Sequence, residues 1–424
     1  MKGLLFTYAL TYGGAAAALF NPFYGLLIYI CFAIVRPESM WFYSVPQGNY
    51  SRIIALALLV GWALKGFGNW NFGRSRASVF ALIGFFLWMC VGALAARDSA
   101  IGWADVEAKF KVVLPCLVGF TVIENTRQLK QLGWVIILSQ GFVAYEANMS
   151  YLGGFNSIHE LGFGGMDNNC VAIAMVCASG LAFFLGLAET VLWRRGLAFV
   201  AAGLMAHAVM LAESRGGMLG LLISGAASFI LIRKRPVYYA YLLLAVGVGF
   251  YLAGPSVWKR FNSSFAEESE RDYSAQSRLD LWNTCLKVML REPVFGLGTN
   301  QFPVYASQLG FTEGKSAHSL WMELGVENGI PGLGFLLAFY LITMWRLWRV
   351  SKLLLPVAPE VADGCRMVIA SLLGFMISAQ FVSLLGLELP YFVAMIGGGY
   401  LKLSDAILEQ STYAAQADLD QGSC

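Results

Sequence analysis

The stretch GPSVWKRFNSSFAEESERDYSAQSRLDLW occupies residues 254–282, and a mostly polar character continues to AHSLW at 317–321. Apolar runs precede and follow this stretch, so it divides the chain into two hydrophobic parts. Long loops are uncommon, because fixing the backbone costs about 1–2 kcal/mol per residue. We therefore expect this loop to carry the functional side chains and the apolar segments to support it.

The composition is that of a membrane protein. Of the 424 residues, 58% are hydrophobic and only 13% are charged. A soluble globular chain has about 25% charged residues, so roughly half of the usual charge is missing. The net charge of +3 gives no indication of nucleic-acid binding, and the eight cysteines have no CxxC or Cys-His spacing. We expect no metal, no cofactor and no disulfide framework.

Apolar runs of spanning or near-spanning length predict about 12 or 13 transmembrane helices. In lipid these segments must be helices, because an open sheet would leave backbone amides without partners. The predicted fold class is therefore an all-α polytopic membrane protein with one large helical loop. The runs cover residues 4–20, 22–35, 53–68, 78–96, 110–123, 131–149, 169–189, 196–213, 216–232, 237–253, 327–348, 366–385 and 388–403.

Clusters of basic residues indicate the orientation, because positive loops stay in the cytoplasm. Such clusters lie at 127–130, 194–195, 233–235 and 346–352 and place 150–168 and 254–320 on the outer face. We expect N-terminal transmembrane helices over 1–253, an outer loop over 254–320, C-terminal transmembrane helices over 321–403 and a cytoplasmic tail over 404–424. The side of the N-terminus stays open, because the break at Asn21-Pro22 allows either two spans or one re-entrant pair.

His318 is the first candidate for chemistry, because it lies where the outer loop meets an apolar helix. Histidine suits proton transfer at neutral pH, although a capping role is the alternative. His207 lies in an apolar run and is expected to be structural. His159 lies in a glycine-rich outer segment that ends with Asn168 and Asn169, and these three are supporting candidates.

Arg215 and Arg278 are the second pair of candidates. Arg215 stands in ESRGG on the predicted outer side, where a salt bridge to Glu213 is the alternative to binding an anion. Arg278 is expected in the first turn of an amphipathic helix that Ser274 or Ser277 caps and Pro293 ends. A cation there is unfavourable unless an anion lies nearby, although a solvated arginine is the alternative. One face of this helix is expected to lie on the protein or the membrane surface, because it carries Leu279, Trp282, Leu286 and Met289 or Leu290.

Glu323 and Glu327 are four residues apart on the helix that follows His318. They share one face, so either could orient or ionise the imidazole, and a capping role is the alternative. The glycines of FGLGTNQF at 295–302 lack the following Lys-Ser/Thr of a nucleotide-binding loop. One histidine and two arginines on the outer side fit a diphosphate-linked substrate, whose transfer would need no metal.

The motifs ESRGGMLGLL from Glu213, SRLDLW from Ser277, REPVFGLGTNQF from Arg291 and AHSLWMELGVENGIPG from Ala317 occur in this order. In this respect the chain resembles the bacterial O-antigen ligase and polymerase family. The segments MKGLLF, NPFYGLLIY and RPESMW also resemble a subgroup of putative O-glycosylation ligases associated with exosortase systems, more loosely. Family members often carry asparagine after the histidine, where this chain has Ser319.

This resemblance implies a membrane glycosyltransferase with a GT-C-like architecture in the bacterial inner membrane, active on the periplasmic face. The donor would be a glycan on undecaprenyl diphosphate, and the acceptor a hydroxyl of lipid A core, a protein or a glycan. His318 would be the general base, and Arg215 and Arg278 would hold the diphosphate, with inversion at the anomeric carbon. A polymerase of the same family is the main alternative to a ligase. A lipid-linked glycan flippase is a third hypothesis, disfavoured because the polar groups gather at one face and no repeat is visible.

Overall fold

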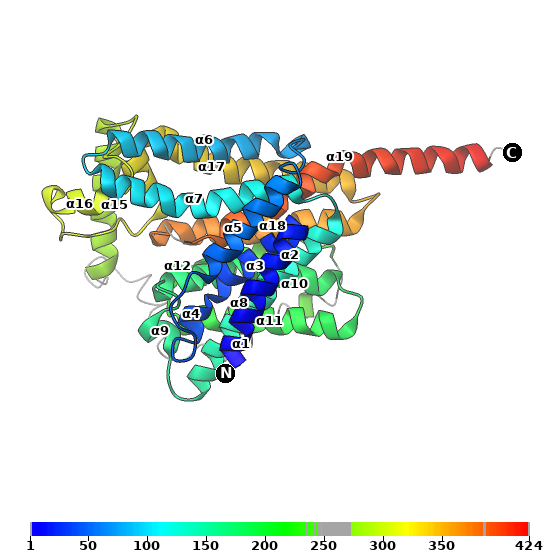
Figure 1. Cartoon of the computed structure of the whole chain (residues 1–424), viewed down its shortest axis with the longest axis horizontal. Coiled ribbons are helices and arrows are strands. Elements are labelled where there is room, and N and C mark those ends of the chain that lie inside the picture. The colour runs from blue at the N-terminus through cyan, green and yellow to red at the C-terminus, as the bar shows by residue number, and fades with distance from the viewer. Residues whose placement is uncertain are drawn as a thin grey trace.

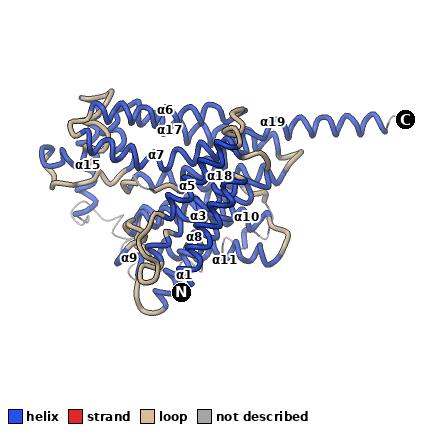
Figure 2. Tube along the Cα trace, in the orientation of Figure 1, coloured by secondary structure: helices blue, strands red, loops and turns tan. Residues whose placement is uncertain are grey.

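A computed structural model describes residues 2–234, 273–384 and 387–422, together with a few residues between 236 and 247. The described chain is built from helices and contains no strand (Figure 2). The expected span at 237–253 and the first part of the expected loop, up to residue 272, lie outside the described residues. The predicted all-α polytopic class is confirmed by the architecture of the rest.

The helices follow the apolar runs closely. Each expected span that falls on described residues corresponds to a helix. The N-terminal part contains α1 (Lys2–Tyr8), η1 (Ala9–Gly13), α2 (Gly14–Phe20), α3 (Pro22–Val35), α4 (Pro37–Met40), α5 (Tyr50–Leu64), η2 (Gly73–Ser75), α6 (Arg76–Ala95), α7 (Ser99–Val122), α8 (Thr126–Leu152), α9 (Ser157–Leu161), α10 (Asn168–Ala188), α11 (Leu192–Leu211) and α12 (Arg215–Leu231). The C-terminal part contains α15 (Tyr273–Arg291), α16 (Phe302–Tyr305), η4 (Ala306–Leu309), α17 (Leu320–Leu354), α18 (Pro359–Ser378), η5 (Ala379–Phe381) and α19 (Leu389–Gly422).

The first two spans form a hairpin. Asn21 adopts an extended conformation between α2 and α3, and its side chain accepts a hydrogen bond from the Phe23 amide at 3.0 Å. The hairpin brings the N-terminus back to the loop after α3, where the ring of Phe6 lies 5.4 Å from that of Trp41. The N-terminus therefore lies at the same end of the bundle as Arg36.

Helix α10 forms the centre of the bundle, with every residue from Val171 to Ala182 buried. It packs against α8, α11, α12 and α18. Helices α6, α7 and α17 run side by side along the long axis and cover one side of this core (Figure 1). Helix α17 is kinked at Gly329, where φ is +64°. The kink separates the short first part of the helix, before Gly329, from the long part that follows it. Helices α15 and α16 lie at one end, and the long C-terminal helix α19 projects from the opposite end (Figure 1).

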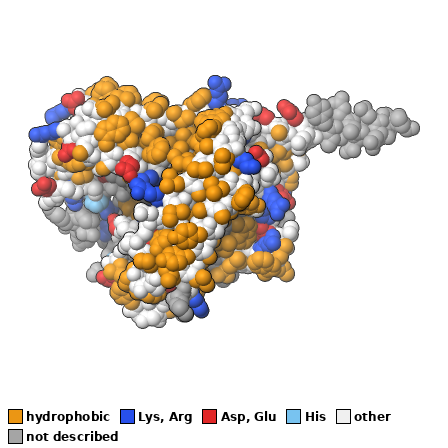
Figure 3. All heavy atoms as spheres, viewed as in Figure 1, with side chains coloured by type: hydrophobic (Ala, Val, Ile, Leu, Met, Phe, Trp, Pro, Cys, Tyr) orange, Lys and Arg blue, Asp and Glu red, His pale blue; other side chains and the backbone are white. Residues whose placement is uncertain are grey.

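The predicted cytoplasmic residues gather at the end from which α19 projects. Arg74 forms a 2.6 Å ion pair with Asp405, and Arg346 donates to the carbonyl oxygen of Arg74. Figure 3 shows hydrophobic side chains over the middle of one face, with most charged side chains toward its two ends. Leu56 and Leu87 belong to this exposed apolar surface, at 58% and 57% exposure. The arrangement is that expected of a membrane-spanning bundle.

Seven helical segments of the described chain are long and apolar enough to cross a membrane. Two shorter apolar helices, Tyr50–Leu64 and Arg215–Leu231, accompany them. The predicted count of about 12 or 13 is higher because it also includes α7, α8 and α19, which carry more polar residues, and the run at 237–253. Helix α19 continues through the expected tail as far as Gly422.

Candidate functional site

His318 lies in the short segment that joins the loop to α17. Its backbone adopts a left-handed conformation with φ +50°, which is uncommon for a residue other than glycine. Ser319 follows as the N-cap of α17, and its hydroxyl accepts a hydrogen bond from the Met322 amide at 3.3 Å. The serine that replaces the family's frequent asparagine therefore starts this helix, and the sharp turn fixes where the imidazole leaves the backbone.

Two side chains hold the backbone beside His318, and a third side chain holds one of them. The carboxylate of Glu323 accepts a hydrogen bond from the Ala317 amide at 2.9 Å and another from the Ser383 hydroxyl. The indole nitrogen of Trp282 donates to the Ala317 carbonyl oxygen at 3.1 Å. We call these residues the clamp (Trp282, Ala317, Glu323 and Ser383). Glu323, expected to act on the imidazole, instead binds the backbone one residue before it.

Charged groups from distant parts of the chain act on the imidazole. Burial, the Arg278 guanidinium and the Lys315 ammonium lower the pKa of His318 below its ordinary value of 6.5, whereas the Asp167 carboxylate raises it. The net direction is downward, so the neutral imidazole is favoured at neutral pH. Arg278 belongs to α15 and Asp167 is the N-cap of α10, so charges from separate parts of the chain influence the imidazole.

Arg278 lies on α15, which is the amphipathic helix expected before Pro293. The helix extends from Tyr273 to Arg291, so Ser274 and Ser277 lie inside it and neither is its cap. Arg278 is consequently in the second turn rather than the first, and the expected argument from the helix dipole does not apply. Nothing in the sequence Tyr-Ser-Ala-Gln interrupts a helix, which explains the earlier start.

The expected apolar face of α15 packs against the protein only in part. The predicted stripe includes three leucines that are exposed, whereas a different stripe packs against α16, the 317 segment and α17. Both stripes recur at helical spacing, so periodicity alone does not separate them. The exposed residues are Leu279, Leu286 and Leu290, and the buried ones are Leu281, Cys285 and Val288.

Arg215 is the first residue of α12 and is half-buried. Ser214 caps the helix by accepting from the Gly217 amide at 3.2 Å. A side chain at Gly216 would lie 2.8 Å from Phe381, whose ring is 6.1 Å from that of Trp282 in the clamp. The start of α12 is therefore joined to the clamp through two aromatic rings.

The asparagines before α10 support the turn that carries Arg215. Asn168 donates to the Ala212 carbonyl oxygen at 2.9 Å, and Asn169 donates to the Asn168 side chain at 3.1 Å. His159 lies on α9, and its Nδ1 atom is buried without a hydrogen-bond partner among the described residues. Within the described chain no hydrogen bond or ion pair joins His159 to His318.

The segment at 295–302 docks the loop onto the bundle. Gln301 exchanges two hydrogen bonds with the backbone of Asp98, at 3.0 and 3.1 Å, just before α7. Thr299 donates to the Asn328 side chain at 2.8 Å, and Glu327 accepts from the Phe302 amide at 3.1 Å. These motif residues therefore build the fold of the loop, and Glu327 is occupied with this backbone.

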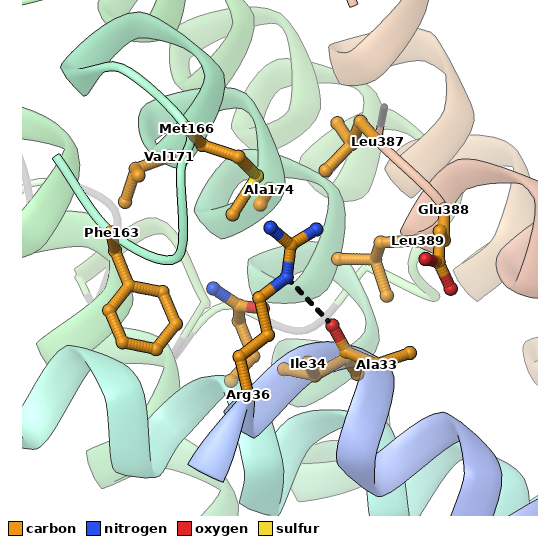
Figure 4. Close-up of a pocket in the computed structure, with 11 residues that line it drawn as sticks. Ala33, Ile34, Arg36, Phe163, Met166, Val171, Ala174, Leu387, Glu388 and Leu389 are labelled. Atoms are coloured by element: carbon orange, nitrogen blue, oxygen red, sulfur yellow. Dashed lines mark hydrogen bonds between the residues drawn. The ribbon is translucent and has the colours of Figure 1, made fainter. Parts of the chain in front are cut away.

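A small pocket flanks the beginning of α10, with about 380 Å³ of empty volume. The Arg36 guanidinium extends into it (Figure 4), donating to the Ala33 carbonyl oxygen at 3.3 Å and to that of Gly164. One carboxylate oxygen of Glu388, on the opposite wall, is buried without a hydrogen-bond partner in the described chain. Arg36 thus joins the end of α3 to the turn that precedes α10.

Two further observations concern cysteine and metal chemistry. The seven cysteines of the described residues are free thiols. The same residues contain no group of three or more His, Cys, Asp or Glu side chains arranged to hold a metal ion.

His207, expected to be structural, contacts the side chain of Asn148 within the bundle.

The assignment of Arg278 and His318 to one site stays a prediction. The fold places Arg278 on the helix whose Trp282 binds the residue before His318, and it adds neighbours that the sequence did not indicate. From the sequence, Trp282 was predicted only as part of an apolar helix face, and no sequence pattern pointed to Ser383. Asp167 could have been found, because an aspartate directly before a long apolar run is a common N-cap.

Comparisons with known proteins give matches to two parts of the chain. Residues 200–337 match the family described as O-antigen ligase, and residues 1–184 match a family of unknown function (DUF5935). An uncharacterized protein of Haemophilus influenzae is 26% identical over 154 residues, which cover 32% of this chain and 39% of that protein. The match therefore spans about two fifths of the length of this curated relative. The region that matches the O-antigen ligase family contains Arg215, Arg278 and His318, and it supports the assignment of this chain to an O-antigen ligase-like family.

Proposed function

We propose that this protein is a glycosyltransferase that moves a glycan from undecaprenyl diphosphate to an acceptor hydroxyl on lipid A core or a protein. The family match supports a glycan-transferring ligase or polymerase in general. The observation that supports the specific proposal is that α15 carries Arg278 and, one turn later, Trp282, whose indole donates to the carbonyl oxygen of Ala317, the residue before His318.

The proposed reaction is a single displacement at the anomeric carbon. The neutral imidazole of His318 takes the proton of the acceptor hydroxyl, and the oxygen attacks the carbon that bears the diphosphate. The new glycosidic bond forms as the bond to the diphosphate oxygen breaks, and undecaprenyl diphosphate leaves with the electron pair. Arg215 and Arg278 hold the leaving diphosphate and stabilise its developing charge. One displacement inverts the anomeric centre.

The test uses the purified full-length protein in nanodiscs with a lipid-linked glycan donor and candidate acceptors. We expect release of undecaprenyl diphosphate, an inverted product and no inhibition by EDTA. His318→Ala should lower kcat by about 10²–10⁴-fold while donor binding persists. Full activity of this variant would remove His318 from the reaction, and inhibition by EDTA would overturn the metal-free mechanism.

The arginines are tested by donor affinity. Arg215→Ala and Arg278→Ala should weaken donor binding about tenfold or more, because each removes a charged hydrogen-bond donor. Arg291→Ala, at the exposed end of the same helix as Arg278, is the matched control and should bind donor normally. Unchanged affinity in the first two variants would contradict the diphosphate clamp.

The products separate the two family activities. A ligase gives one transfer per acceptor, whereas a polymerase gives a ladder of products. Movement of the donor across the membrane without any product would instead indicate a flippase.

A further inference from the structure

Helix α15 carries a stripe of leucines that the proposed reaction does not use. Leu279, Leu286 and Leu290 are 45%, 42% and 66% exposed, and their spacing places them on one face of the helix. Scattered apolar side chains are normal on a protein surface, whereas a row of large ones marks an interaction surface. The stripe therefore needs a partner.

Three sides of α15 differ in character. Leu281, Cys285 and Val288 are buried against α16, the 317 segment and α17. Lys287 and Arg291 belong to an exposed charged side. Because successive residues are rotated by about 100°, the leucine stripe lies between the buried side and the charged side. A helix with an apolar face beside a charged face is typical of the interface between membrane and water.

The direction of α15 agrees with such a position. Helices α6, α7 and α17 run along the long axis of the bundle, whereas α15 runs across one end of it (Figure 1). Membrane-spanning helices lie close to the bilayer normal. A helix that crosses the end of the bundle therefore lies close to the bilayer plane, with its three stripe leucines at similar depth.

The loop after α15 contacts a membrane-spanning helix below its end. The ring of Phe295 stacks on that of Trp88 of α6, with centroids 5.3 Å apart and 11° between the ring planes. Trp88 precedes the last residue of α6, Ala95, by seven residues, which is about 10 Å along the helix. This end of α15 is therefore held at the level of the lipid-facing part of α6 rather than above it.

Exposed apolar residues connect the stripe with the spanning helices. Val294 and Phe295 are 48% and 39% exposed, and Ile330, at the kink of α17, is 51% exposed. The Ile330 amide donates to the Pro293 carbonyl oxygen at 2.8 Å, so the loop and α17 are bonded to each other. Leu94 of α6 is 70% exposed. The apolar surface thus extends from α15 through this loop to helices whose partner is lipid.

We propose that α15 is an interfacial helix whose leucine stripe (Leu279, Leu286 and Leu290) binds the acyl chains of the adjacent lipid leaflet. Lys287, beside the stripe, extends its ammonium group to the lipid phosphates, because long basic side chains keep their charge in the headgroup layer. The contact does not depend on glycan transfer. For the proposed function, it would hold Arg278, on the same helix, near the headgroups, where a lipid-linked diphosphate lies.

The experiment places the photoreactive amino acid p-benzoylphenylalanine at single positions of the full-length protein in nanodiscs of phosphatidylethanolamine and phosphatidylglycerol. Leu286 and Lys287 are adjacent and both are exposed, but only Leu286 belongs to the stripe. After illumination, mass spectrometry measures the protein that carries a phospholipid joined through an acyl chain. We expect about tenfold more of this adduct from position 286 than from position 287.

A second matched pair tests the other end of the helix. Leu279 and Asp280 are also adjacent and exposed, and they should differ in the same way. Equal acyl adducts within the pairs would overturn the proposal. Crosslinks from 279 and 286 to protein would do so too, because another segment or a second copy would then cover the stripe. Adducts at 286 without adducts at 279 would contradict a helix that lies along the membrane.

The measurement is independent of catalysis. The four replaced side chains are exposed, so the buried side of α15 is the same in every variant. No glycan donor is needed, and an inactive protein with the expected adducts would overturn only the proposed function. An active protein without them would overturn only the interfacial position of α15.

Discussion

The substitution Trp282→Phe removes a single hydrogen-bond donor, the indole nitrogen, from the clamp. The indole donates to the Ala317 carbonyl oxygen at 3.1 Å, and its ring packs 6.1 Å from that of Phe381. Phenylalanine keeps an aromatic ring against Phe381 but removes the donor. Because Ala317 is fully buried, its carbonyl oxygen would lose its partner without gaining access to water.

The expected magnitude follows from this geometry. An intramolecular hydrogen bond contributes about 0.5–1.5 kcal/mol, and an unsatisfied buried acceptor costs about 1–3 kcal/mol. We expect a local loss near 1.5 kcal/mol, which corresponds to about a tenfold change in a rate or population. The loss should appear as lower kcat rather than weaker donor binding, because neither proposed diphosphate arginine is touched.

The assay measures kcat, donor affinity and hydrogen–deuterium exchange at 311–319 for Trp282→Phe beside a matched control. Trp193→Phe is suitable, because Trp193 is 65% exposed on α11 and lies far from the clamp in the chain. If Trp282→Phe exchanges and turns over like Trp193→Phe, the 317 segment does not depend on this bond. The reasoning that a fixed backbone positions His318 would then be refuted.

Three other predictions concern the electrostatics, the loop and the topology. Arg278→Gln removes a cation that lowers the pKa of His318, so the acidic limb of the kcat/KM profile should move to higher pH; Asp167→Asn should move it to lower pH. Gly329→Ala should destabilise the protein by several kcal/mol, because φ is +64° and the added Cβ would lie 2.2 Å from a backbone carbonyl oxygen. The control Gly334→Ala should not lower the melting temperature, because its Cβ would enter open space. A tag at the N-terminus should be digested by protease added to spheroplasts and a C-terminal tag protected; the reverse result would invert the proposed orientation.

Local sequence signals predicted most of the bundle, because membrane helices are specified by long apolar runs. The hairpin at Asn21 and the end of α15 before Pro293 were predictable from single residues with strong backbone preferences. The packing face of α15 was not, because Leu279 and Leu281 begin two stripes of similar spacing. Only the position of the neighbouring elements decides which stripe is buried.

The candidate site residues were predictable, but their supports were not. Arg278 and His318 were predicted from residue type, location and the family resemblance, with a solvated arginine and a capping histidine as the alternatives. Asp167 precedes α10 and Ser383 follows η5, and no spacing rule connects either residue to His318. Contacts between residues so far apart in the chain come from the fold, which periodicity does not determine.

A buried acidic side chain shows why the site extends beyond His318 itself. A carboxyl group buried among apolar residues reduces stability relative to a well-packed hydrophobic residue, unless it serves another purpose. Glu323 is 1% exposed and binds the backbone directly beside His318. A hydrophobic residue at position 323 could fill the same space but could not hold the Ala317 amide. The buried carboxyl group of Glu323 is therefore best explained by the position of one imidazole.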